Sequence, residues 1–176
     1  GIFSRPGAIA VMREMNANAA LEYGMTEYED KLDFLSVDIT VEEGDILDLG
    51  GLTLSVLDAP GHTKCSIAFY IPQEHMLISC ETLGVYAGED KVAPCYLIGY
   101  EMSMNFIRRV QRMDVDKILI PHYGVLEGEP CRAFINHALC YNEKLKELIM
   151  EEHCTGKNYE EILNRYKEEF YTENLQ

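Results

Sequence analysis

The stretch LTLSVLDAPGHT, residues 52–63, decides the fold of this chain. Apolar residues alternate at Leu52, Leu54 and Val56, which predicts a strand with one buried face. Pro60-Gly61 then breaks the strand and leaves His62 on the loop just past its end. Because loops held by a rigid scaffold often carry functional side chains, a histidine in this position can face a cleft.

Two further strands are predicted directly after this loop, over residues 67–71 and 76–79. The second of them ends in Cys80-Glu81-Thr82-Leu83. A later strand over residues 117–120 runs through Pro121 into His122 in the same way. Two imidazoles and a carboxylate therefore each follow a predicted strand end, where loops gather at one edge of an α/β sheet.

The rest of the chain predicts elements that surround this block. Residues 46–49 and 52–57 are typical of a hairpin, and residues 37–40 alternate weakly enough for an edge strand. Residues 82–99 predict a long loop, which forms either a wall of the substrate cleft or an aromatic packing segment.

Four helices are expected from their start signals, stop signals and apolar spacing. The first begins at Pro6 and stops at Gly24, and the last begins at a capping box of Asn158 and Glu161. Between them lie a helix over residues 132–153 and a helix whose buried face is predicted to hold Met102, Phe106, Val110 and Met113.

This order of motifs resembles the metallo-β-lactamase-fold hydrolases, most of all their glyoxalase II-like branch. The likeness covers residues 41–128 and consists of Pro-Gly-His-Thr, Cys-Glu-Thr-Leu and Ile-Pro-His-Tyr-Gly, each at a strand end. The resemblance implies an α/β fold, the αββα sandwich of that family. It also implies a two-metal site in which His62 binds the first metal, Glu81 bridges both metals and His122 binds the second.

Two departures from the family pattern shape this interpretation. The chain lacks His-x-His-x-Asp-His, which supplies most ligands of both metals and precedes the other motifs. We therefore interpret residues 1–176, which open on Gly1, as one partial domain that is truncated at its N-terminal side and carries a helical segment at 131–172. In addition, Glu81 stands where the family usually has Asp, and the longer side chain shifts the bridge and with it the metal preference. Zinc is the expected metal, and iron and manganese are alternatives.

The three residues form a reasonable ligand set even without the resemblance. Two neutral imidazoles and a carboxylate suit Zn(II), Fe(II) or Mn(II), and three ligands leave a position for water. Each residue has a plainer alternative: His62 can cap the backbone that follows it, Glu81 can be an exposed strand-end acid, and His122 can be a packing histidine. Asp58 is the expected oxygen acceptor for a metal-bound imidazole.

Composition bears on the partners. Fifteen Lys and Arg against thirty Asp and Glu give a net charge of −15, which repels nucleic acid and anionic membranes. We expect a small-molecule substrate, with a homo-oligomer left open because a half sandwich exposes an apolar sheet face. Six cysteines without a C-x-x-C pair predict reduced thiols in a cytoplasmic protein, and no apolar run reaches membrane-spanning length.

These residues predict a metal-dependent hydrolase of a small ester, thioester, lactone or phosphoester that uses a metal-bound hydroxide. Glu81, His62 and His122 are both the expected metal ligands and the expected catalytic residues. Because the chain carries only part of the metal site, we expect it to be inactive alone. Two alternatives stay open: a di-iron or persulfide-type oxidoreductase of the same fold, and a non-catalytic, metal-poor oligomerising fragment.

Overall fold

The computed structural model describes residues 5–25, 27–32, 36–88 and 91–170. The chain divides into two compact units, residues 1–40 and residues 41–176, and each is described by itself. That the whole chain forms one domain stays a prediction. No helix in the described part of the chain is long and apolar enough to cross a membrane.

The first unit is built on one helix, α1 (Pro6–Glu22). Pro6 suits the first turn because the N–H it lacks has no partner there, and Gly24 follows the helix with φ +69°. The start and stop predicted from the sequence are therefore confirmed. The predicted edge strand over residues 37–40 is wrong: no strand forms there, and Val37 and Ile39 are 65% and 75% exposed.

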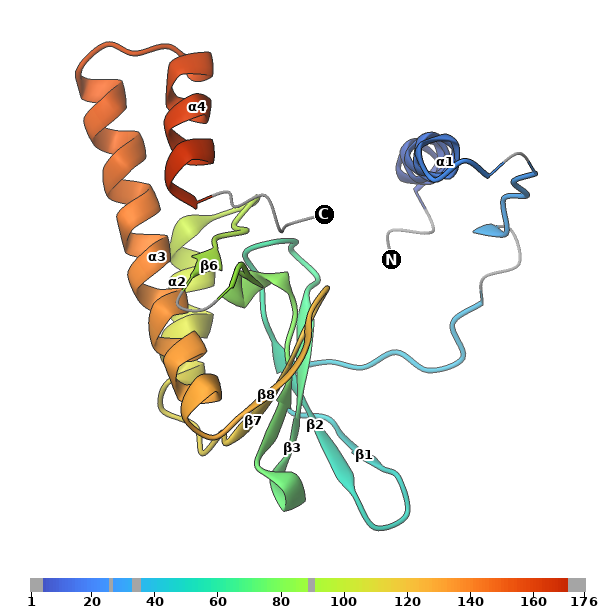
Figure 1. Cartoon of the computed structure of the whole chain (residues 1–176). Helices are drawn as coiled ribbons and strands as arrows, with labels where there is room; N and C mark the ends of the chain where they lie inside the picture. The colour runs from blue at the N-terminus through green and yellow to red at the C-terminus, as the bar shows by residue number, and fades with distance from the viewer. Residues whose placement is uncertain (1–4, 26, 33–35, 89–90, 171–176) are drawn as a thin grey trace. The chain divides into compact units, whose positions relative to one another are not determined.

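The second unit is organised around a six-stranded sheet in the order β1-β2-β3-β4-β7-β8 (Figure 1). Only the β4–β7 pair is parallel. The six strands of the sheet are β1 (Ile46–Asp48), β2 (Thr53–Asp58), β3 (Ile67–Ile71), β4 (Met76–Ile78), β7 (Lys117–Ile120) and β8 (Gly124–Glu127). The predicted hairpin and the three later strands predicted over residues 67–71, 76–79 and 117–120 are confirmed, whereas β8 has no counterpart among the predictions.

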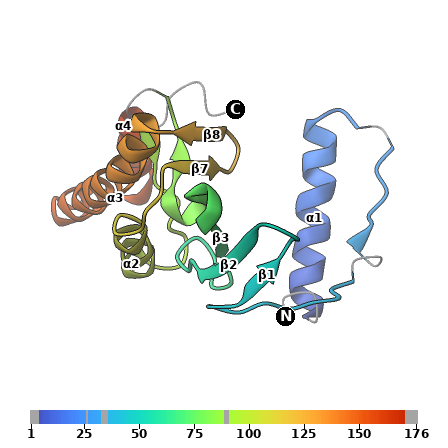
Figure 2. The same cartoon turned by 90° about the horizontal axis from the view of Figure 1, so that it is seen from below.

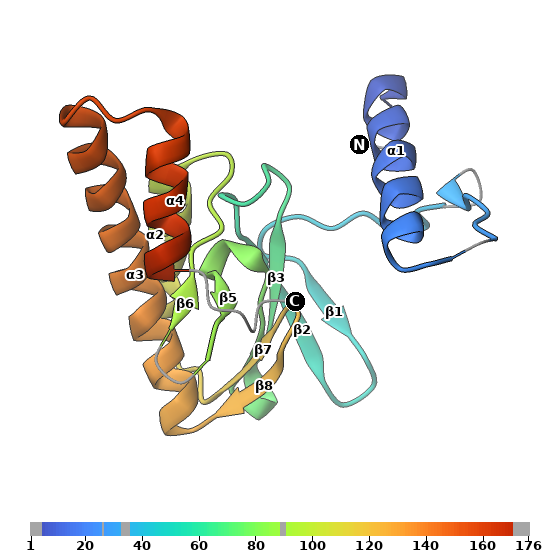
Figure 3. The ribbon, with the colours of Figure 1, turned by 45° about the horizontal axis from the view of Figure 1, so that its top comes forward.

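Residues 82–99 are more regular than the predicted loop. A 3₁₀ turn (Glu81–Leu83) follows β4, and β5 (Val85–Tyr86) pairs antiparallel with β6 (Val92–Ala93). Figure 3 shows this ribbon between α3 (Glu129–Cys154) and the sheet. Strands of two residues are too short to show a periodic pattern, which is why the sequence did not reveal them.

Helices α2 (Tyr100–Val110) and α3 cover one face of the sheet (Figures 1 and 2). Met104, Phe106 and Ile107 are buried against Leu77 and Ile118 in the same core. The predicted face of α2 is partly wrong, because Met102 is 44% exposed. The buried stripe of this helix is set by Ser103, Phe106, Ile107 and Val110 instead.

Helix α4 (Tyr159–Phe170) turns back along α3 (Figure 3). The predicted capping box is present: the Asn158 N–H donates to Glu161 Oε2 at 2.8 Å, and the Glu161 N–H donates to Asn158 Oδ1 at 3.1 Å. Phe170 is buried against Leu145 and Leu148 of α3. The helical segment predicted for 131–172 thus consists of α3 and α4, and its last two residues lie outside the described range.

The other face of the sheet is apolar at its centre. Phe69 of β3 pairs with Ile78 of β4, Ile78 pairs with Leu119 of β7, and each of the three is only partly buried. Within the described part of the second unit, the sheet therefore has a helix-covered face and a second face on which hydrocarbon remains accessible.

Candidate functional site

The three predicted ligands leave the sheet at the same edge. Strands β2, β4 and β7 run in one direction, because β3 is antiparallel to both β2 and β4, and β7 is parallel to β4. His62 follows β2, Glu81 follows β4 and His122 follows β7. The carboxyl ends of parallel strands are where α/β proteins usually place their ligands.

Glu81 and His122 lie together at this edge. Glu81 Oε1 is 3.4 Å from His122 Nε2, and the two side chains are 31% and 68% exposed. Two ligands bound at 2.0–2.2 Å to one tetrahedral metal ion lie roughly 3.3–3.5 Å apart. The observed separation therefore suits both a long ion pair and two ligands of one ion, and the exposure of His122 argues against the alternative of a packing histidine.

His122 is held by a tight hairpin between β7 and β8. Ile120 pairs with Gly124, and the Tyr123 N–H donates to the Ile120 carbonyl oxygen at 3.4 Å. His122 has a φ of +65°, a conformation that few residues with a Cβ adopt. The turn thus projects the imidazole from the sheet edge at some cost in backbone strain, as residues at functional sites often do.

His62 is fixed by three contacts from other segments. Its Nδ1 lies 2.9 Å from the Cys95 carbonyl oxygen, and its N–H donates to Thr82 Oγ1 at 3.3 Å. The Ile98 N–H donates to the carbonyl oxygen of Gly61, which directly precedes His62, at 2.8 Å. The ring partner lies 33 positions away in the sequence, so His62 does not cap the backbone that follows it.

Gly61 is required for this arrangement. A Cβ at this position would lie 2.1 Å from Ser103 Oγ and 3.0 Å from Ser103 Cα on α2, and the Gly61 φ is +144°. Both the close approach of α2 and the backbone conformation exclude a side chain. The Pro-Gly turn therefore sets where the loop carrying His62 meets α2.

Sequence reasoning missed two of the contacts that hold His62. Thr82 is buried, and besides accepting the His62 N–H it donates to the Ala59 carbonyl oxygen at 2.6 Å. Cys95 contributes only its backbone carbonyl, which no side-chain pattern can reveal. The acceptor for the His62 ring is therefore Cys95, and the Asp58 carboxylate suggested by the sequence does not take that place.

The donor set fits part of a metal site. Imidazole and carboxylate are ligands that zinc, iron and manganese accept. Among the described residues, however, no three His, Cys, Asp or Glu side chains come together in a group that could hold a metal ion. The structure thus brings Glu81 and His122 together and places His62 on a neighbouring loop, outside any such group.

Two thiols lie beside these residues. Burial, with a further contribution from the Glu81 charge, raises the pKa of the Cys95 thiol to about 11. Burial likewise raises the pKa of the Cys80 thiol. Since the thiolate is the form that binds metals and attacks carbonyl groups, the raised pKa values disfavour both roles for these cysteines.

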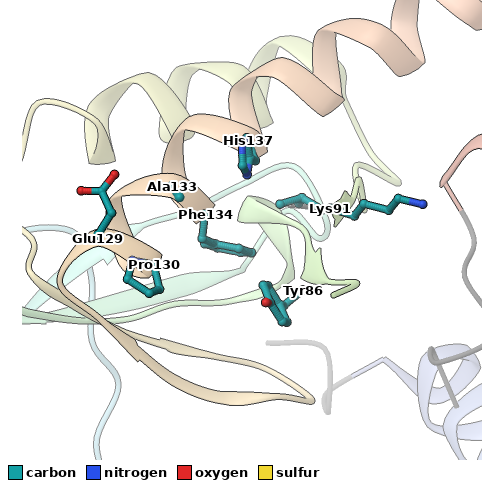
Figure 4. A pocket seen from close by; sticks show the side chains of 8 residues that line it. Tyr86, Lys91, Glu129, Pro130, Ala133, Phe134 and His137 are labelled. Carbon is teal, nitrogen blue, oxygen red and sulfur yellow. The ribbon is translucent and has the colours of Figure 1, made fainter. Parts of the chain in front are cut away.

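A cavity of about 260 Å³ lies between Tyr86 of the β5–β6 ribbon and helix α3 (Figure 4). The Tyr86 ring packs 4.3 Å from the ring of Tyr123, the neighbour of His122. The charged ends of Lys91 and Glu129 lie at opposite ends of this cavity in Figure 4. They do not converge on one point, so the cavity shows no built site for a charged ligand.

Comparison with known proteins identifies a matching family and partly similar enzymes. A family model described as the metallo-beta-lactamase superfamily matches residues 4–123. Hydroxyacylglutathione hydrolase from Rhodopseudomonas palustris (strain BisB5) is 40% identical over 47 residues, which are 27% of this chain and 18% of that protein. The same enzyme from Rhizobium meliloti (strain 1021) is 32% identical over 72 residues, 38% of this chain and 28% of that protein. The matches thus span less than a third of these curated relatives.

A solved structure has a similar fold. An archaeal metallo-beta-lactamase superfamily protein from Sulfolobus tokodaii superimposes with a TM-score of 0.59 and 20% identity, over 80% of this chain and 55% of that one. At this identity the likeness speaks for the fold alone. Together with the family model it confirms the metallo-β-lactamase fold predicted from the motifs. Because that model matches more than half of its residues, the chain belongs to the metallo-beta-lactamase superfamily.

Proposed function

We propose that this chain carries part of the metal site of a hydrolase that cleaves a small ester, thioester, lactone or phosphoester. The observation that supports the proposal best is the 3.4 Å separation of Glu81 Oε1 and His122 Nε2 at the edge where β4 and β7 end. Part of the chain is similar to hydroxyacylglutathione hydrolases, whose name describes a hydrolytic reaction. That similarity favours hydrolysis over oxidation.

Glu81 and His122 would hold the metal, with zinc as the first choice. A bound divalent metal lowers the pKa of a coordinated water to about 7, which supplies hydroxide at neutral pH. The Cys95 carbonyl oxygen can only accept a hydrogen bond, so Nδ1 of His62 carries the proton and Nε2 of the neutral ring keeps its lone pair. His62 is therefore in the tautomer that a ligand needs, and the remaining ligands would come from a His-x-His-x-Asp-His segment.

The proposal also covers the kind of substrate, the cellular location and the self-association of the chain. The net charge of −15 disfavours nucleic acid and anionic membranes and leaves a small molecule as the substrate. All six cysteines are free thiols, as a cytoplasmic protein would keep them. The accessible apolar face around Phe69, Ile78 and Leu119 would favour self-association of the chain when it is alone.

The proposal is tested by comparing this chain with a longer polypeptide in which a His-x-His-x-Asp-His segment precedes it. Metal content is measured by mass spectrometry after dialysis against zinc, and hydrolysis is assayed on an ester, a thioester, a lactone and a phosphoester. We expect weak binding to the chain, and roughly two metals with measurable turnover in the longer protein. A longer protein that is fully folded, metal-free and inactive would overturn the proposal.

Substitutions in the longer protein separate the ligands from surface residues. His122→Ala and Glu81→Gln should each lower metal affinity, whereas His75→Ala and Glu74→Gln should not. His75 is a matched control because it is also exposed and also has a positive φ, +48°. Glu74 is an exposed acid in the turn before it. Equal metal content in all four variants would remove Glu81 and His122 from the site.

A further inference from the structure

An apolar cavity of about 370 Å³ lies between the segment Pro94–Leu97 and the hairpin of α3 and α4. The segment contributes Tyr96 and Leu97, helix α3 contributes Leu145 and Ile149, and helix α4 contributes mainly Ile162 and Tyr166. The residues that line the cavity are apolar, tyrosine or cysteine, and none of them is charged. Its volume is in the range of ligand pockets, about 300–1,000 Å³.

Buried residues form the floor of the cavity, and exposed residues form its rim. Leu145 is 7% exposed and belongs to a packed cluster with Leu148 and Phe170, against which Tyr96 and Tyr166 also pack. At the rim, Leu97 is 73% exposed and Tyr159 is 76% exposed. A ligand can therefore enter without opening the core, and its entry would cover hydrocarbon that water now contacts.

This cavity and the loop that carries His62 both contact Cys95. Cys95 lines the cavity, and its carbonyl oxygen holds Nδ1 of His62. Three residues further along, the Ile98 N–H donates to the carbonyl oxygen of Gly61. The segment thus forms a wall with the cavity on one side and His62 on the other.

The lining selects against charged ligands. Burial raises the pKa of the Tyr96 phenol to about 12, so this hydroxyl is uncharged at neutral pH. A phosphate or carboxylate placed in the cavity would meet no cation among the described residues that line it and would lose its hydration, which is costly. An uncharged hydrocarbon chain or ring would instead be stabilised by the apolar surface that it buries.

We propose that the cavity between Pro94–Leu97 and the α3–α4 hairpin binds the hydrocarbon part of an uncharged substrate, an acyl chain or an aromatic ring, with its reacting bond on the His62 side of Cys95. The binding site stands on its own lining, while its role in turnover rests on the proposed hydrolase function. Of the four substrate classes, the cavity favours hydrophobic esters, thioesters and lactones and disfavours phosphoesters.

Binding is tested on this chain with N-phenyl-1-naphthylamine, an uncharged probe whose fluorescence rises in apolar surroundings. We expect saturable binding that Ile149→Gln weakens by about tenfold, the equivalent of ~1.4 kcal/mol. Met150→Gln is the matched control, because Met150 is the next residue on α3, is 54% exposed and lies outside this cavity. Leu97→Asp, at the exposed rim, is a second variant that leaves the core intact.

Two results would overturn the binding site: no saturable fluorescence, or equal weakening by Ile149→Gln and Met150→Gln with both variants folded by circular dichroism. The link to the metal site is read from nuclear magnetic resonance. The probe should shift the ring signals of His62 and leave those of His75, on a distant turn, unchanged. A bound probe that shifts neither ring would refute the placement of the reacting bond beside His62.

Measurements of hydrolysis distinguish a failure of this inference from a failure of the proposed function. In a metal-loaded longer protein, KM for p-nitrophenyl esters should fall from acetate to octanoate, and Ile149→Gln should remove this dependence. Probe binding without any hydrolysis would refute the hydrolase and support the cavity as a binding site. Hydrolysis without probe binding, and with one KM for all chain lengths, would refute the cavity and support the hydrolase.

Discussion

The Nδ1 atom of His62 lies 2.9 Å from the carbonyl oxygen of Cys95. This hydrogen bond fixes both the tautomer and the direction of an imidazole whose own loop begins at a Pro-Gly turn. The backbone of His62 is fixed separately, by the hydroxyl of Thr82. The geometry of His62 is therefore determined by two segments that follow it in the sequence, and several consequences can be measured.

Replacing Thr82 should destabilise the protein through two lost hydrogen bonds. Thr82→Val keeps the shape of the side chain but leaves the His62 N–H without its partner and leaves the Ala59 carbonyl oxygen only the long contact with Cys80 Sγ at 4.0 Å. An unsatisfied buried polar group costs about 1–3 kcal/mol, so the free energy of unfolding in urea should fall by that order. Thr82→Ser keeps the hydroxyl and should lose less; a larger loss for Ser than for Val would contradict this role.

Replacing His122 should separate backbone strain from ligand chemistry. The φ of +65° favours glycine, so His122→Gly should be more stable to urea than His122→Ala by about 1 kcal/mol. Both variants lose the imidazole and should bind metal equally poorly. At His137, inside helix α3, the order should reverse, because glycine destabilises a helix interior by about 1 kcal/mol relative to alanine. Equal stabilities of the two His122 variants would show that the turn carries no strain.

The ion pair between Glu43 and Arg109 should give stability a measurable dependence on pH. Two hydrogen bonds of 3.0 and 2.7 Å join the side chains, and they lower the pKa of Glu43 below its ordinary value of 4.5. The native state then binds fewer protons than the unfolded chain. The stabilisation is present above pH 4.5 and is lost as the pH falls through the lower, folded pKa.

Because both side chains are about 40% exposed, the pair should contribute only about 0.5 kcal/mol. Glu43→Gln should remove that amount at pH 7 and much less at pH 3, measured by urea unfolding at each pH. Glu42→Gln, one residue earlier on the same turn, is the control. An effect of Glu43→Gln that does not change between the two pH values would speak against the ion pair.

Removing the cap of α4 should loosen this helix locally. Asn158→Ala deletes the acceptor for the Glu161 N–H and should cost about 1 kcal/mol. Amide hydrogen exchange should accelerate along α4 and little in the sheet, because Phe170 of α4 is buried against Leu145 and Leu148 of α3. Asn164→Ala, at an exposed position inside α4, should not accelerate exchange. Unchanged protection of α4 in Asn158→Ala would show that packing alone holds this helix.

The sequence predicted parts of the fold correctly where the physical cause is local. The alternation of Leu52, Leu54 and Val56 predicted β2, and Asn158 with Glu161 predicted the start of α4. The predicted ligands do lie at one sheet edge, although only Glu81 and His122 are close enough to form a pair. Their role as ligands stays a prediction.

The misses have non-local causes. The two-residue strands β5 and β6 are defined by their mutual pairing and carry no period. The partner of His62 is a backbone carbonyl, and backbone atoms are the same in every residue. The stripe of α2 is shifted toward Ser103 because Gly61 lets the loop approach that residue closely. Such features depend on which segments meet in space, which a single sequence does not state.

The parallel pairing of β4 with β7 also bears on how the protein folds. Met76 pairs with Lys117, so the ribbon and α2 lie in the connection that must close before these strands can meet. Closing a long connection is entropically costly, so we expect this pairing to form late. Since β4 leads into Glu81 and β7 into His122, these two side chains would first become neighbours when that pairing forms.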